Sequence, residues 1–108
     1  MITVTVKRQT GQRTVQEVSI SGHAHYDDYG KDIVCAAVSS VSINIINAAE
    51  ALLNIPLETE ERDGTILCRV PELREAKKNE HVQLLMETLV YSLKSIAEEY
   101  PSFVLIRE

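Results

Sequence analysis

The feature that most constrains this chain is a long apolar run over residues 33–53 that contains a single charged residue. Apolar side chains recur in it at steps of three and four, from Val34 to Leu52, which is the period of one helix face. Nothing interrupts this pattern before Asn54 and Pro56. The run therefore predicts one helix of about six turns.

The other faces of this predicted helix are also apolar or small, unlike those of an ordinary surface helix. A helix without a charged face is expected to be covered on more than one side. One sheet in a chain of 108 residues cannot cover both sides. The sequence therefore predicts a homodimer with this helix at or near the interface.

A second helical pattern covers residues 79–100, where charged side chains lie mostly opposite an apolar stripe. Asn79 is a plausible N-cap for it, because its side chain can accept a bond from a free backbone N–H. This is the pattern of an amphipathic helix with one face in solvent.

Five short segments have the composition and alternation of strands. Asp63-Gly64 separates two of them and favours a tight hairpin. The C-terminal segment is apolar on both faces, so it is predicted to be a well-covered strand. The predicted strands cover residues 2–7, 14–20, 57–61, 65–70 and 102–108.

The predicted order is strand, strand, helix, strand, strand, helix, strand. It indicates an α+β fold, in which a small mixed or antiparallel sheet is covered by two helices. No linker interrupts the pattern, so residues 1–108 are expected to form a single domain.

Charge and cysteine usage limit the partners and the compartment. The net charge of −5 disfavours binding to a nucleic-acid backbone, which requires clustered basic residues, and is compatible with a basic peptide. Cys35 and Cys68 form neither a disulfide framework nor a CxxC pair, and the first residues lack a signal-peptide pattern. We expect a cytoplasmic protein with reduced thiols and no membrane span.

The segment SGHAHYDDYGKDIVCAA, residues 21–37, concentrates the reactive side chains. Asp32 stands where an N-cap is expected, which places Cys35 in the first helical turn, where free N–H groups and the helix dipole favour an anion. The thiolate is the nucleophilic form of cysteine, and the loop before the helix supplies two candidate bases, His23 and His25. N–H groups at the helix start are candidates for an oxyanion hole.

Other interpretations of these residues stay open. A cysteine is often a small buried hydrophobe, and Cys68 fits that role because it alternates with apolar residues on a predicted strand. The chain would then be a non-enzymatic homodimeric module that binds an assembly partner or another protein. A loop metal site is a third, weaker alternative, because zinc-site spacing is missing. Its ligands would be His23, His25, Asp27 and Asp28.

The residues Gly22-His23-Ala24, Gly30 and the segment from Asp32 to Ser39 resemble the signature of the ribosomal-processing cysteine protease family, Prp. The resemblance extends over the whole chain. It implies a homodimeric bacterial cysteine protease without a cofactor. Its expected substrate is the precursor of a large-subunit ribosomal protein of the L-twenty-seven family, whose short N-terminal extension is removed after an aromatic residue.

The resemblance also assigns roles within the motif. It implies that Cys35 is the nucleophile and His23 the general base, and it leaves His25 without a role. The loop is expected to move, with glycines at its two ends as hinges. Ser39, one turn below Cys35, is a candidate for a hydrogen bond to substrate or for close packing, and close packing is the favoured interpretation. The supporting positions are Gly22, Gly30, Asp32 and Ser39.

Overall fold

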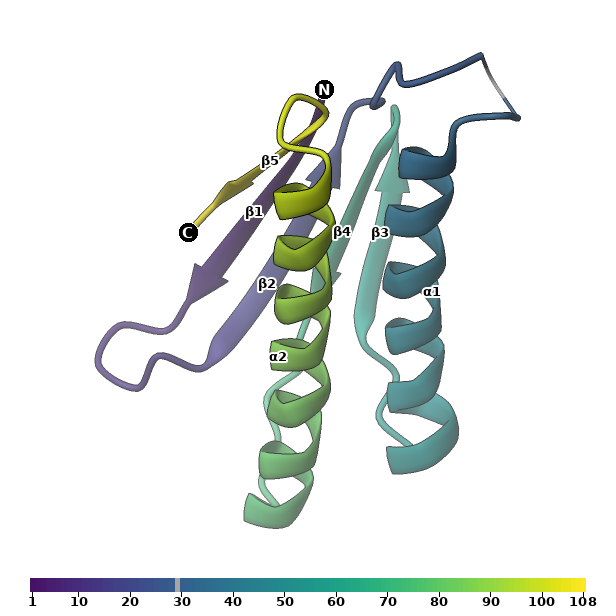
Figure 1. Cartoon of the computed structure of the whole chain (residues 1–108). Helices are drawn as coiled ribbons and strands as arrows, with labels where there is room; N and C mark the ends of the chain where they lie inside the picture. Colours follow the sequence, from purple (N-terminus) through teal and green to yellow (C-terminus); the bar gives the residue numbers. More distant parts are fainter. Residues whose placement is uncertain (29) are drawn as a thin grey trace.

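The computed structural model describes residues 1–28 and 30–108, and Figure 1 shows its seven elements. The two helices lie side by side on one face of a five-stranded sheet. The predicted α+β class and element order are confirmed. In chain order the elements are β1 (Ile2–Arg8), β2 (Val15–Ser21), α1 (Ile33–Leu53), β3 (Glu58–Arg62), β4 (Thr65–Arg69), α2 (Ala76–Glu99) and β5 (Val104–Arg107).

The sheet has the strand order β3-β4-β2-β1-β5. All neighbouring pairs are antiparallel except β1 and β5, which are parallel. The register places Val18 between Val6 on one side and Cys68 on the other, so one face of the sheet is apolar. Because side chains alternate along each strand, this face is the one that the helices cover.

The core lies between that face and the two helices. α1 contributes Val34, Val38 and Ala49, and α2 contributes Met86 and other fully buried residues. Among the described residues, α1 alone has the length and hydropathy of a membrane-spanning helix, a criterion that core helices of soluble proteins also meet.

Two details of the sequence prediction are wrong. α2 begins one turn before Asn79, whose N–H already donates to the carbonyl of Glu75, so Asn79 is an interior residue and not an N-cap. β5 is an edge strand beside β1, and its Leu105 is exposed because helices cover only one face of the sheet. The apolar composition of β5 predicted that both of its faces would be covered, but a strand at the edge of a sheet with helices on one face is covered only on that face.

The topology brings three segments together at one end of the sheet. β2 ends at Ser21, which pairs with Thr65 directly after the β3–β4 turn. In that turn Asp63 and Gly64 both have positive φ, as a two-residue type I′ hairpin requires. The loop that follows β2 leads to the first turn of α1 at the same end (Figure 1).

Candidate active site

Asp32 fixes the start of α1. Its Oδ1 accepts hydrogen bonds from the backbone N–H groups of Val34 and Cys35, both at 3.0 Å. Its own backbone is extended, as an N-cap residue requires, so the predicted cap is confirmed. Cys35 therefore stands in the first turn of α1, and its side chain is half-buried.

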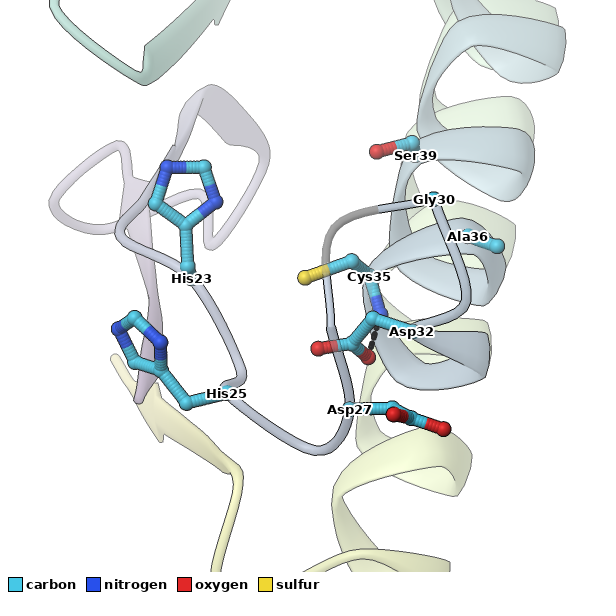
Figure 2. A pocket seen from close by; sticks show the side chains of 8 residues that line it. All are labelled: His23, His25, Asp27, Gly30, Asp32, Cys35, Ala36 and Ser39. Atoms are coloured by element: carbon cyan, nitrogen blue, oxygen red, sulfur yellow. Dashed lines mark hydrogen bonds between the residues drawn. The ribbon is translucent and has the colours of Figure 1, made fainter.

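The thiol of Cys35 lies in a hollow of about 580 Å³ between α1 and the loop after β2. Figure 2 shows its sulfur pointing away from the helix, toward the wall that carries the two histidines. The backbone N–H of Ala24 donates to this sulfur at 3.3 Å. The residues that line the hollow are His23, His25, Asp27, Gly30, Asp32, Cys35, Ala36 and Ser39.

The two histidines form the opposite wall of the hollow (Figure 2). Their ring centroids are 6.0 Å apart in an edge-on arrangement, and His23 lies beside the β3–β4 turn, near Gly64. Within the described part of the chain, no hydrogen bond joins His23 to Cys35. Pairs of this kind often tighten only when substrate binds, so this geometry keeps His23 as a candidate base.

Tyr26 anchors the first half of the loop, and the sequence analysis did not single it out. Its backbone N–H donates to Asp32 Oδ2 at 2.9 Å. Its ring meets Tyr100 and Phe103 edge-on, with centroids 5.6 and 5.1 Å away. Local sequence carries no signal for this contact, because the two partners follow Tyr26 by more than seventy residues and meet it only in the fold.

Gly22 is required for packing as well as for its conformation. It has a φ of +85°, and a Cβ at this position would lie 2.5 Å from the carbonyl oxygen of Met1. Gly30 has nearly the same φ, +86°, but a Cβ there would meet nothing within 4 Å. A side chain at Gly22 would therefore destabilise the fold more than a side chain at Gly30.

We expect Gly22→Ala to destabilise the protein more than Gly30→Ala. The left-handed backbone alone costs a non-glycine residue about 1–2 kcal/mol at either position. Only Gly22→Ala adds a clash with the backbone of Met1, just before β1, so Met1 or the loop has to shift. Urea denaturation of both variants measures the difference, and equal losses of stability would contradict this explanation.

The carboxylate of Asp32 is held ionised by its backbone partners. Partial burial opposes ionisation, but the N–H groups of Cys35 and Tyr26 outweigh it and hold the pKa of Asp32 below its usual range. Since the folded pKa is lower than the unfolded one, the ionised group stabilises the fold above the usual carboxyl range. This contribution is lost as pH falls through the lowered pKa.

Asp32→Asn is accordingly expected to keep most of any activity that depends on the thiol of Cys35. The amide oxygen of the asparagine can still cap α1, whereas its NH₂ group cannot accept the hydrogen bond from the N–H of Tyr26. Thermal melting against pH should show a deficit relative to the parent chain near neutrality that shrinks in acid. Asp28→Asn, on the same loop but outside the hollow, is the control and should show no such trend. A deficit that is constant with pH would contradict this role of Asp32.

Three further expectations for site residues have different outcomes. Ser39 is exposed on the wall of the hollow, so the expectation that it packs closely within the chain is wrong. Cys68 is fully buried, as predicted, and burial raises the pKa of its thiol to about 11. Among residues 1–28 and 30–108, no group of three or more His, Cys, Asp or Glu side chains is arranged to hold a metal ion.

Curated proteins and solved structures resemble this chain over nearly its full length. The ribosomal processing cysteine proteases Prp of Bacillus subtilis (strain 168) and Staphylococcus aureus (strain Mu50) are 29% and 32% identical over 102 residues. These alignments cover 93% of this chain and 90% and 92% of the relatives.

Two crystal structures of the S. aureus protease share the fold. The complex with a covalently linked product peptide superposes with a TM-score of 0.88 at 31% identity. The complex with a substrate peptide gives 0.82 at 30% identity. Each comparison covers 99% of this chain and 98% of the other.

The fold, the hollow and these relatives define a small α+β protein of the cysteine protease class. The family model of the cysteine protease Prp matches residues 1–105, and the chain belongs to this family.

Proposed function

We propose that this protease removes the N-terminal extension of a large-subunit ribosomal protein of the L-twenty-seven family, cutting after an aromatic residue and so supporting ribosome maturation. The observation that carries the proposal is the thiol of Cys35, which opens from a helix start into a hollow faced by His23 and His25. The S. aureus relatives in complex with a substrate peptide and with a covalently linked product peptide support a peptide as the ligand.

In the proposed reaction Cys35 is the nucleophile and His23 the general base. His23 takes the proton of the thiol, and the sulfur forms a bond to the carbonyl carbon while the π electrons move to oxygen. When the carbonyl re-forms, the C–N bond breaks and the protonated His23 gives its proton to the leaving amine. The extension then remains as a thioester on Cys35.

Water completes the turnover. His23 takes a proton from the attacking water, a second tetrahedral species forms, and the C–S bond breaks to return the thiol and release a carboxylic acid. The loop between Gly22 and Gly30 carries His23, and in our proposal it orders over the substrate during this cycle. Asp32 supports both walls of the hollow, because it caps α1 and also accepts a hydrogen bond from the backbone N–H of Tyr26 in the loop.

Charge and compartment agree with this proposal. A net charge of −5 suits a basic ribosomal-protein tail. Both cysteines are free, as expected in the reducing cytoplasm, where we place the reaction.

The test uses a synthetic peptide that spans the extension and the first residues of the mature ribosomal protein. Intact-mass spectrometry after incubation should show two products that together add one water, with a single cut after an aromatic residue. A peptide with that aromatic residue replaced by alanine is the matched control and should remain largely uncut. Tight binding without any cleavage would contradict the proposal and favour a binding module.

We also propose that the protein is a homodimer that uses α1. Within the described residues of one chain, Ile33, Ile43 and Leu52 of α1 are 53%, 48% and 75% exposed. Ile33 and Ile43 lie about 80° apart around the helix axis and leave an apolar face of this nearly uncharged helix uncovered, while Leu52 is exposed at its C-terminal end. Such a face favours burial against a second copy.

Size-exclusion chromatography with light scattering should give a dimer at micromolar concentration. Ile43→Glu is expected to shift the protein toward monomer, because it places a charge in the proposed interface. The control Leu84→Glu alters a leucine of α2 that is 68% exposed and should leave the dimer intact. A monomeric parent chain would contradict the proposal.

A further inference from the structure

Three N–H groups in the first turn of α1 are already engaged. Those of Val34 and Cys35 donate to Asp32 Oδ1, and that of Ala36 donates to the backbone carbonyl of Asp32. Although a helix start is a common place to stabilise an anion, these three donors point to their own cap. These three groups are therefore not free to form an oxyanion hole in this structure, although the sequence made N–H groups at the helix start candidates for one.

Ala24 provides a backbone donor at the reacting atom. Its N–H, on the loop that follows β2, points to the sulfur of Cys35 at 3.3 Å. In the tetrahedral species the negative oxygen is bonded to the carbon that the sulfur has attacked, so it lies next to that sulfur. After attack the sulfur is a neutral thioether, which accepts hydrogen bonds weakly, and the N–H becomes available to the oxygen.

The position of this N–H is fixed on both sides. The side chain of Ala24 is in the core, with only 3% of it exposed. Two residues before it, Gly22 packs against the carbonyl of Met1, and two residues after it, Tyr26 is bound to Asp32 and to the aromatic residues near the end of α2. A donor held in this way needs little reorganisation when charge develops, which is the property that makes oxyanion holes effective.

We propose that the backbone N–H of Ala24 is an oxyanion-hole donor of this protease. This inference rests on the proposed function, in which Cys35 is the nucleophile. The step that the donor assists is the formation of the C–S bond, when the π electrons of the carbonyl move to oxygen. It assists again when water attacks the thioester and the same oxygen becomes negative.

The direct test removes one N–H without changing a side chain. Cys35 permits native chemical ligation of a synthetic segment 1–34 to a recombinant segment 35–108, which yields the full chain. L-lactic acid in place of Ala24 converts the N–H to an ester oxygen and keeps the methyl group. We expect kcat to fall by about 10²–10³-fold with little change in KM, because the donor acts on the transition state.

A second readout separates catalysis from loop structure. A peptide aldehyde forms a tetrahedral adduct with the thiol, so its affinity should fall by a similar factor in the residue-24 ester. The affinity for the uncleaved peptide should stay the same, measured in both ligated backbones after desulfurisation has converted the two cysteines to alanine. An ester at residue 26, which removes the N–H that binds Asp32, is the control for loop structure. It should not lower the affinity for the aldehyde more than the affinity for the uncleaved peptide.

NMR of the unmodified protein gives an independent test that requires no backbone change. With ¹⁵N-alanine labelling, the amide proton of Ala24 should move downfield when the aldehyde adduct forms. The matching peptide alcohol, which cannot form the adduct, should not produce this shift. An unmoved Ala24 resonance would overturn the inference.

The remaining outcomes separate the two proposals. If the residue-24 ester keeps kcat and aldehyde affinity within about twofold of the ligated parent, the inference fails and the proposed function stands. If it loses affinity for peptide and aldehyde equally, Ala24 has only a structural role and the inference also fails. A ligated parent that cleaves nothing, or a Cys35→Ala chain that cleaves equally fast, overturns the proposed function first and the inference with it.

Discussion

Replacement of Cys35 by alanine is expected to reduce cleavage of the precursor peptide to the uncatalysed background. The substitution removes the only atom in the proposed mechanism that forms a covalent bond with the substrate. Alanine keeps the helix start, since the bonds from Val34 and residue 35 to Asp32 use backbone N–H groups. The variant should therefore fold and bind peptide normally. Intact-mass spectrometry over a time course measures the loss.

Cys68→Ala is the matched control for this result. Cys68 is buried in the core face of β4, so its replacement should lower stability through lost packing and leave the cleavage chemistry in place. Iodoacetamide should modify Cys35 in the native protein and spare Cys68, because burial shields that thiol and raises its pKa to about 11. Cleavage that survives in Cys35→Ala and disappears in Cys68→Ala would reverse the assignment.

The sequence predicted the fold well where one periodic pattern determines one element. α1 begins directly after Asp32 and ends directly before Asn54 as expected, because these residues are its N-cap and its left-handed C-cap. The errors arose where tertiary contacts decide. α2 closes its first turn before Asn79 with a bond to Glu75, and β5 lies at an edge that local composition does not reveal.

The candidate site could be predicted in its side chains but not in its backbone. The spacing of His23, Asp32 and Cys35 indicated thiol chemistry at a helix start, and the structure places all three around one hollow. The bond from Ala24 to the sulfur depends on how the loop folds across the helix. Backbone donors leave no mark in residue type, so a sequence cannot identify them.

The second large effect is expected from His23→Gln. Glutamine has a similar size and keeps hydrogen-bonding atoms, but it cannot take the thiol proton and return it to the leaving amine. General acid–base catalysis contributes typically 10²–10⁴-fold, and we expect a loss of kcat/KM in that range, about 10³-fold. His25→Gln is the control, because His25 lines the same hollow from a position two residues away. Its loss should be below about tenfold if His23 alone exchanges the proton.

The dependence of kcat/KM on pH separates proton transfer from mere positioning. If His23 is the base, the acid limb of the profile should disappear in His23→Gln and persist in His25→Gln. Loss of that limb in His25→Gln, with His23→Gln nearly active, would assign the base to His25. Both rings line the hollow that holds Cys35, with centroids 6.0 Å apart, so only the paired variants distinguish them.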